Sequence, residues 1–318
     1  MAISQVVIPA AAAFLISALL GPVIIPVLTR LKMDQTERAL GVKSHLAKAG
    51  TPTMGGIMIL IAAAAAALFY IPAYPRIGPV LFLTVAFGLI GFLDDYLKVV
   101  KKRSDGLIAW QKLLLQIAVT AVFYVYMSQS GISLALRVPF THGSTIDIGF
   151  LAVPLLFVAV IGTVNGTNFT DGVDGLASSV TVVVAFFFVI SSLLLEAGVE
   201  PLAAAMAGAL MGFLVHNAHP ARVFMGDTGS LAMGGFVAGC AYMMNMPLYI
   251  VIVGLIYLIE VLSVMMQVTY FKATHGKRIF KMAPIHHHFE LCGWSETRVV
   301  TNFTVVTVLL SLLAVLAL

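Results

Sequence analysis

Long apolar segments separated by short polar loops constrain this chain more than any other feature of its sequence. Of its 318 residues, 60% are hydrophobic and 10% are charged, whereas a soluble domain carries about 25% charged residues. A helix that crosses a membrane needs about 20 mainly apolar residues. The segments that reach or approach this length are 3–28, 54–71, 79–93, 113–130, 151–164, 176–195, 202–215, 231–246, 248–268 and 299–318. We therefore predict an all-α, polytopic integral membrane protein with ten transmembrane helices, in which residues 1–318 form one domain.

Lysine and arginine are concentrated in alternate loops of this arrangement. The odd-numbered loops are residues 29–53, 94–112, 165–175, 216–230 and 269–298. These loops hold sixteen of the 18 Lys and Arg residues, and the even-numbered loops hold only Arg76 and Arg137. Because positively charged loops stay in the cytoplasm, we predict that the odd loops are cytoplasmic. Ten spans then place both termini on the extracytoplasmic, or periplasmic, side.

Acidic residues and histidines gather in the same odd-numbered loops. Ten of the 14 Asp and Glu residues and seven of the eight histidines lie there. A surface that only bound lipid head groups would need lysine and arginine alone. A mixture of carboxylates, lysines and histidines instead indicates an active site on the cytoplasmic face.

Two adjacent carboxylates, Asp94 and Asp95, end the third apolar segment in the string FLDDYLKVVKK. Neighbouring carboxylates repel each other and raise one pKa unless a cation lies between them. Because neighbours on a helix face about 100° apart, the two side chains can serve different partners. One could meet a metal ion while the other takes a proton. The alternative is a solvated helix end that nearby lysines neutralise.

The loop NGTNFTDGVDG carries oxygen-bearing side chains at every third position, which are Asn165, Asn168, Asp171 and Asp174. In a helical turn this spacing places them on roughly one face. Carboxylate and amide oxygens suit Mg²⁺ or sugar hydroxyls rather than zinc. The alternative is a polar connection whose glycines and asparagines serve only turn formation.

The string FMGDTGS, which opens the eighth segment, places Asp227 where a helix begins. An aspartate that caps the helix explains this position. The functional interpretation is a magnesium ligand, with glycines that let a diphosphate approach the helix start.

Three further segments carry candidate groups. PIHHHFE contains three consecutive histidines, whose nitrogens could bind phosphate, stack on a sugar or transfer a proton. HLAKAGTPTMGG offers Lys48 to phosphate, although Thr53 could simply cap a helix. Lys112 stands just before the fourth segment as a membrane anchor or a phosphate ligand. Glu260 lies well inside the ninth segment, where a functional group and a buried hydrogen bond to another helix are equally good interpretations.

The strings HLAKAGTPTMGG, FLDDY, NGTNFTDGVDGL, FMGDTGS and APIHHHFE stand in this order in the chain. In this order they resemble the polyprenyl-phosphate N-acetylhexosamine-1-phosphate transferases, and TPTMGG and PIHHHFE resemble the phospho-N-acetylmuramoyl-pentapeptide transferase family in particular. The resemblance implies UDP-N-acetylmuramoyl-pentapeptide and undecaprenyl phosphate as substrates, and lipid I and UMP as products. It also implies Mg²⁺ dependence, a homodimer in the bacterial cell membrane, a role in peptidoglycan synthesis, and inhibition by nucleosides such as tunicamycin and muraymycin. Nucleic acid is not an expected partner.

The resemblance also implies roles for individual residues. Asp94 would be the base that removes the proton of the lipid phosphate, with Asp95 beside it in the metal or substrate shell, and Asp227 would bind Mg²⁺. The expected catalytic residues are Asp94, Asp95, Asp227 and His286, and the further candidate metal ligands are Asp95, Asn165 and Asp171. The expected substrate contacts are Lys48, Thr53, Lys112, Asn165, Asp171, Gly172, Asp174, Asn217, Phe224, Ser230, Gln267, His287 and His288. Among these, Phe224 would stack on uracil.

Two alternatives remain at this level. A sibling transferase that uses UDP-N-acetylglucosamine would share the aspartate motifs, so the distinction depends on TPTMGG and PIHHHFE. A transporter would place polar groups near the bilayer midplane and show repeated halves. The polar residues of this chain gather at one rim instead, and its sequence shows no internal repeat.

Overall fold

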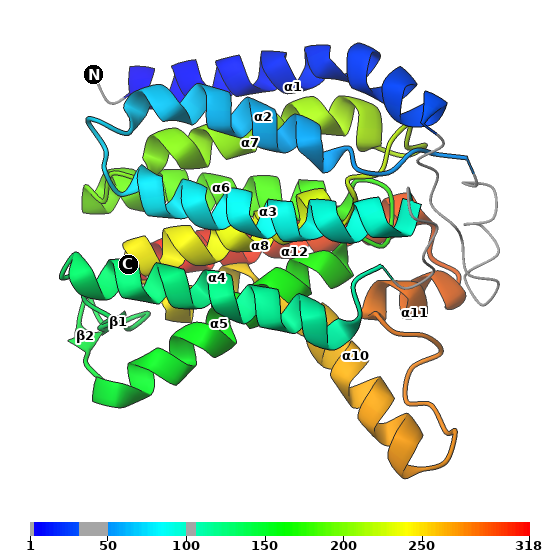
Figure 1. The fold of residues 1–318 in the computed structure, drawn as a ribbon. Helices are drawn as coiled ribbons and strands as arrows, with labels where there is room; N and C mark the ends of the chain where they lie inside the picture. The colour runs from blue at the N-terminus through cyan, green and yellow to red at the C-terminus, as the bar shows by residue number, and fades with distance from the viewer. Residues whose placement is uncertain (1–2, 32–49, 100–105) are drawn as a thin grey trace.

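The computed structural model describes residues 3–31, 50–99 and 106–318, and these residues form a bundle that is helical almost throughout (Figure 1). Lys48 lies outside the described residues. The elements are α1 (Ser4–Arg30), α2 (Gly56–Ala67), η2 (Leu68–Tyr70), α3 (Ile77–Val99), α4 (Ala109–Gln129), β1 (Leu136–Arg137), β2 (Thr145–Ile146), η3 (Gly149–Leu151), α5 (Ala152–Thr170), α6 (Leu176–Leu195), α7 (Glu200–Asn217), α8 (Gly226–Met243), η4 (Pro247–Tyr249), α9 (Ile250–Val253), α10 (Leu255–Ala273), α11 (Ile285–Leu291) and α12 (Glu296–Leu316).

Every segment predicted to span the membrane is helical in the structure. Among the described residues, seven helices are long and apolar enough to cross a membrane: α1, α3, α4, η3 with α5, α6, α10 and α12. The helices α2, α7 and α8 are not among them, since α2 is short and α8 begins with polar residues and glycines. The chain is therefore an all-helical polytopic membrane protein, while the number of ten spans stays a prediction.

Two predicted segments differ in detail from the structure. The ninth is not one helix, because the chain forms η4 and α9 and then restarts as α10 after Gly254. The PIHHHFE string, which we assigned to a loop, forms the short helix α11. The first segment is a continuous helix although Pro9, Pro22 and Pro26 lie inside it, as expected for a helix whose freed backbone groups find other partners.

Helix α8 runs through the middle of the bundle with nearly all of its side chains buried. Its neighbours approach it closely because glycines stand at the contacts. A Cβ atom added to Gly56 of α2 would lie 2.2 Å from the Gly229 nitrogen, and one added to Gly91 of α3 would lie 2.0 Å from the Asp227 carbonyl oxygen. A Cβ on Gly234 would lie 2.4 Å from Cα of Val164 in α5. The start of α8 is thus locked between the backbones of three other helices.

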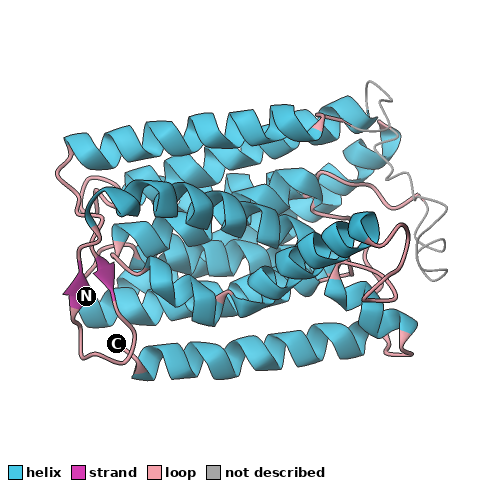
Figure 2. Ribbon diagram, turned by 90° about the horizontal axis from the view of Figure 1, so that it is seen from below, coloured by secondary structure: helices cyan, strands magenta, loops and turns pink. Residues whose placement is uncertain are grey.

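The two ends of the bundle differ in what they carry. Both chain termini lie at one end, together with the antiparallel pair β1–β2, in which Leu136 pairs with Ile146 (Figures 1 and 2). We call this the terminal end. Helix α11 lies at the opposite end, which we call the α11 end, and α10 leans out of the bundle there (Figure 1). The described parts of the odd-numbered loops lie at the α11 end (Figure 1).

Candidate active site

The two adjacent aspartates at the end of α3 have different partners. The Asp95 carboxylate accepts hydrogen bonds from the backbone nitrogens of Asp227 (3.2 Å) and Thr228 (2.9 Å), and from the Thr228 hydroxyl (2.7 Å). These donors form the first turn of α8, whose backbone N–H groups have no partner within the helix. Asp95 therefore caps α8 from α3 and fixes the relative position of the two helices.

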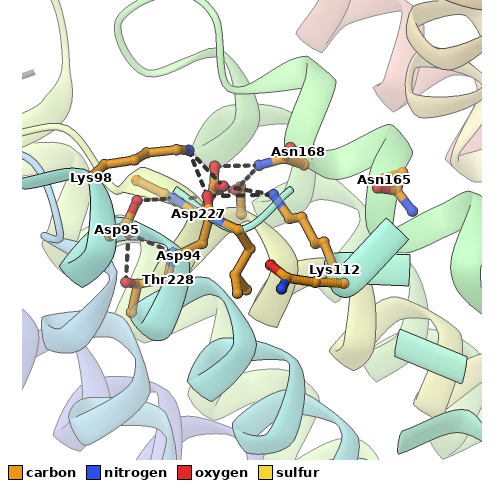
Figure 3. A network of polar contacts seen from close by, with 12 residues as sticks. Asp94, Asp95, Lys98, Lys112, Asn165, Asn168, Asp227 and Thr228 are labelled. Atoms are coloured by element: carbon orange, nitrogen blue, oxygen red, sulfur yellow. Dashed lines mark hydrogen bonds and ion pairs between the residues drawn. The ribbon is translucent and has the colours of Figure 1, made fainter. Parts of the chain in front are cut away.

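Asp227 is the meeting point of groups from four helices (Figure 3). Its Oδ2 atom lies 2.6 Å from Lys112 Nζ of α4 and 3.1 Å from Lys98 Nζ of α3. Its Oδ1 atom accepts a hydrogen bond of 2.8 Å from the Asn168 side chain of α5, which also donates to the Ser230 hydroxyl. The carboxylate is thereby held by two cations and one amide.

Asp94 faces the same cluster from α3. Its Oδ2 atom forms an ion pair with Lys98 and lies 3.7 Å from Lys112 Nζ. Its Oδ1 atom accepts a hydrogen bond of 2.7 Å from the backbone nitrogen of Leu107. The Asp94 side chain is only 2% exposed, whereas that of Lys98 is 40% exposed. The negative charges are therefore covered, and one of their cations reaches solvent.

The two lysines govern the charge of Asp227, which precedes the apolar part of α8 and lies outside the seven candidate spans. Burial acts to raise the pKa of the Asp227 carboxyl. The charges of Lys112 and Lys98 and the hydrogen bond from Lys112 outweigh this effect and hold the pKa well below its usual range. The group is therefore an anion at neutral pH.

The chemistry of this cluster fits a magnesium ion. Asp94, Asp95 and Asp227 each offer one carboxylate oxygen, and these oxygens lie within 4.8 Å of one another. Mg²⁺ prefers one or two carboxylates together with water and substrate phosphate oxygens. Because Asp95 is engaged by the start of α8, Asp94 and Asp227 are the better placed ligands. Lys98 and Lys112 now neutralise the charge that the ion would neutralise.

The four polar side chains between residues 165 and 174 do not share one helical face, contrary to our expectation. Helix α5 ends at Thr170, and the chain then turns before α6 begins. Asn165 donates to Gln116 of α4 (2.9 Å), so it lies beside the aspartate cluster rather than in it (Figure 3). The Oδ2 atom of Asp174 accepts a hydrogen bond from the backbone nitrogen of Ala221 (3.0 Å) and lies 3.1 Å from His219 Nδ1. Asp171 is the C-cap residue that follows α5.

Several expected substrate contacts hold the protein's own loops in the structure. Asn217 donates to the Val223 carbonyl (2.9 Å), and Gln267 bonds to the backbone of both Ile279 and Phe280 (3.0 Å each). The backbone nitrogen of Phe224 donates to the Pro52 carbonyl (2.8 Å). These contacts order the segments around the aspartates, whatever the side chains bind in addition.

Thr53 and Ser230 lie against the aspartate cluster. A Cβ added to Gly226 would meet the side-chain oxygens of both Asp95 and Thr53. Ser230 shares the Asn168 amide with Asp227. Both residues thus support the start of α8.

The three histidines of α11 point to three different partners. His286 is fully buried, with its Nδ1 atom 3.1 Å from Oε1 of Glu260. His287 Nδ1 lies 2.8 Å from Glu290 within the same helix. His288 Nδ1 accepts a hydrogen bond of 3.1 Å from the Lys281 backbone. None of these three contacts within the described part of the chain involves a residue of the aspartate cluster.

The structure thus joins Asp94, Asp95, Asp227, Lys112 and Ser230 in one network, with Thr53 beside it. Lys98 and Asn168 also belong to the network; sequence reasoning gave Lys98 only a neutralising role and named Asn168 only as one member of the three-residue spacing. The position of Lys98 four residues after Asp94 is the signal for an ion pair along one helix. Asn168 was part of the three-residue spacing, but nothing in the spacing distinguishes it from Asn165.

Comparison with known proteins identifies the family to which the chain belongs. The model of glycosyl transferase family 4 matches residues 77–245, and the phospho-N-acetylmuramoyl-pentapeptide-transferase signature 1 matches residues 48–60. The phospho-N-acetylmuramoyl-pentapeptide-transferase of Acetivibrio thermocellus is 51% identical over 308 residues, which cover 96% of this chain and 93% of the relative. The transferase of Clostridioides difficile is 48% identical, with 99% and 98% covered. The chain belongs to the phospho-N-acetylmuramoyl-pentapeptide-transferase family.

The regions that define this family include the aspartate network. The part matched by glycosyl transferase family 4 runs from α3 to α8 and includes Asp94, Asp95 and Asp227. The phospho-N-acetylmuramoyl-pentapeptide-transferase signature includes Thr53 and Gly56, which lie against the start of α8.

Proposed function

We propose that this protein transfers phospho-N-acetylmuramoyl-pentapeptide from UDP-N-acetylmuramoyl-pentapeptide to undecaprenyl phosphate, which yields lipid I and UMP in peptidoglycan synthesis. The observation that carries the proposal is the network of Asp94, Asp227, Lys98 and Lys112 at one end of a membrane bundle. Family membership supports the choice of substrates. One substrate dissolves in water and the other is confined to lipid, so their reaction has to take place at the membrane surface.

The proposed topology has ten spans in the bacterial inner, or plasma, membrane, with residues 1–318 as a single domain. The α11 end would face the cytoplasm and both termini would face outside. The lysine and arginine distribution supports this orientation. The position of both termini at the end opposite to α11 agrees with an even number of spans (Figure 1).

Mg²⁺ is the proposed cofactor, held by Asp227 and Asp94, with Asp95, Asn165 and Asp171 as further candidates. When bound, it would neutralise the diphosphate of the nucleotide and stabilise the charge on the leaving UMP. Asp95 would keep α8, and with it Asp227, at a fixed distance from α3. Positioning and charge neutralisation of this kind supply most of the catalysis in phosphoryl transfer.

Asp94 is the proposed base for the lipid phosphate. A phosphate oxygen of the lipid would attack the β-phosphorus of the nucleotide, and the bond between the β-phosphorus and the oxygen of UMP would break. Asp94 would accept the proton of the attacking phosphate. Lys112 and Lys98 would leave the carboxylates to bind phosphate oxygens, since both ammonium groups are already within reach. Lys48 would contribute a third ammonium group.

The remaining proposed contacts surround this centre. Asn165, Asp171 and Asp174 would bind uridine or the sugar, His286 and His287 the diphosphate or the sugar, and Phe224 the uracil ring. The further proposed substrate contacts are Thr53, Gly172, Asn217, Ser230, Gln267 and His288. Nucleoside inhibitors such as tunicamycin and muraymycin would compete for these groups, and the active form would be a homodimer.

The polyprenyl tail would lie against α10. This helix leans out of the bundle at the α11 end (Figure 1) and exposes large apolar side chains, among them Met265, Met266 and Val268. Such a surface is compatible with lipid and adjoins the loops that carry the proposed nucleotide contacts.

The decisive experiment measures UMP release by the purified protein. We expect UMP from UDP-N-acetylmuramoyl-pentapeptide with undecaprenyl phosphate and Mg²⁺, and none when either substrate or the ion is omitted. Release from UDP-N-acetylglucosamine instead would identify the sibling transferase. Uptake of labelled nucleotide into vesicles without UMP release would identify a transporter and contradict the proposal.

A further inference from the structure

A buried acid–base pair joins a membrane helix to α11. Glu260 of α10 and His286 of α11 both have no solvent-exposed surface, and His286 Nδ1 lies 3.1 Å from Glu260 Oε1. The ring is not aligned for a straight hydrogen bond, and neither side chain has a hydrogen-bond partner among the described residues. The contact is therefore a close approach of a carboxylate to an imidazole nitrogen. Burying a carboxylate or an imidazole inside a membrane bundle costs free energy unless the two groups are partners of each other.

The opposite edge of the His286 ring faces the loop between α5 and α6. A Cβ atom added to Gly172 would lie 2.0 Å from His286 Nε2 and 2.4 Å from the adjacent ring carbon. Position 172 thus tolerates no side chain while the ring occupies its place. His286 lies between Glu260 on one side and the 171–175 segment on the other.

The same face of α10 also packs on the last turns of α5. A Cβ on Gly166 would lie 2.8 Å from the Tyr257 carbonyl oxygen, one helical turn before Glu260. One half-turn beyond Gly166, Asn168 donates to Asp227. The segment of α10 just before Glu260 therefore packs on the helix that carries Asn168.

We propose that Glu260 is a positioning residue of the transferase: its buried carboxylate holds the His286 ring under Gly172, and the ring fixes the segment that carries Asp171 and Asp174. This inference rests on the proposed function, in which that segment binds the nucleotide. Glu260 touches no substrate in this scheme and acts only through His286. Removal of its charge leaves the ring without a partner, so the loop loses its support while the aspartate network remains complete.

The first test compares two buried carboxylates in the full-length protein. Glu260→Gln removes the charge from the pair, and Glu200→Gln makes the same change at the terminal end, where Glu200 accepts a hydrogen bond from Ser192 (2.6 Å). We expect Glu260→Gln to raise KM for the nucleotide about tenfold, with KM for the lipid unchanged. Glu260→Asp, which keeps the charge, should recover part of the loss, and Glu200→Gln should match the wild type in both KM values.

The outcomes separate this inference from the proposed function. If the wild-type protein releases no UMP, the proposed function fails. If the wild type is active and Glu260→Gln has the same KM values as Glu200→Gln, only the positioning role is excluded. An equal rise of KM for both substrates would also exclude it, because a general structural defect would produce that result.

A second test approaches the pair from the loop and applies even if Glu260→Gln does not fold. Gly172→Ala should raise KM for the nucleotide, whereas Gly162→Ala should not, since a Cβ on Gly162 of the same helix–loop unit meets no atom within 4 Å. Adding His286→Ala removes the ring that the new methyl group strikes. The double variant should therefore be no worse than His286→Ala alone. Additive losses would overturn the proposal.

Discussion

The two ends of this bundle differ in the partners of some of their charged side chains. At the terminal end, charged side chains bond to neutral partners: Arg76 donates to the Ala197 carbonyl (3.1 Å), and Glu200 accepts from Ser192. At the α11 end, Asp94 and Asp227 meet Lys98 and Lys112 across three helices.

The difference indicates what each end is for. A charged side chain that bonds to a backbone carbonyl holds that loop in place, and no other partner would stabilise it further. A carboxylate bonded to an ammonium group can exchange it for a metal ion, and the ammonium group can then bind a phosphate. The charged side chains of the α11 end can thus exchange their partners for a metal ion and a phosphate, whereas those of the terminal end hold the loops there in place.

Removal of the metal should produce the largest contrast between the ends. With EDTA we expect complete loss of UMP release, and with added Mg²⁺ full recovery, because only the carboxylates of the α11 end would bind the ion. The thermal unfolding of the protein should change little, since the lysines neutralise the carboxylates without it. Unaltered UMP release after chelation would contradict the magnesium site.

The substitution Asp227→Asn should have the next largest effect. It keeps the shape of the side chain but removes the charge that two lysines and the proposed ion share. We expect UMP release to fall about 10³-fold, the scale on which loss of one charge-stabilising group acts in other enzymes. The measurement is the rate as a function of Mg²⁺ concentration, and a rate and Mg²⁺ dependence equal to those of the wild type would exclude Asp227 as a ligand.

Asp95→Ala should lower stability as well as activity, because Asp95 caps α8. Loss of a helix cap costs about 1–2 kcal/mol of the free energy of unfolding. Ser295→Ala is a matched control, since Ser295 caps α12 by accepting from the Arg298 backbone (3.2 Å) at an exposed site. Thermal unfolding of the two variants should show the larger loss for Asp95→Ala. An equal or smaller loss would show that Asp95 is not a structural cap.

The smallest effect is expected at the terminal end. Glu200→Gln should lower the free energy of unfolding by about 1 kcal/mol, because an amide replaces the charged acceptor of one buried hydrogen bond. The kcat of UMP release should equal that of the wild type. A large loss of kcat would mean that the terminal end takes part in the reaction, and the contrast between the two ends would not hold.

The sequence was sufficient for the helices and for the side on which the charges gather. Apolar length and charge asymmetry depend only on composition along the chain, so the helical segments and the common end of the described parts of the odd loops were accessible, while the orientation in the membrane stays a prediction. The break before α10 was missed because a glycine inside an apolar run does not by itself end a helix. Helix α11 is seven residues long, too short to show a periodic pattern.

The site was predictable in its residue types and less so in its pairings. Asp94 and Asp95 are adjacent in sequence, but only the packing of α3 on α8 turns one toward lysines and the other toward a helix start. The contact of Glu260 with His286 joins groups 26 positions apart, on helices whose relative angle no spacing rule gives. Such pairings depend on tertiary contacts, and a single sequence does not encode them in any local pattern.

The backbone contacts around Gly56, Gly91 and Gly229 have a consequence for how such a protein can change over evolution. Where main chains touch, an added side chain has no space, so these glycine positions tolerate little substitution. The outlying pieces, α10 and α11, lie outside these three backbone contacts. Diversification toward other sugar nucleotides or other lipids would therefore occur in those outlying pieces, while the central joint is inherited intact.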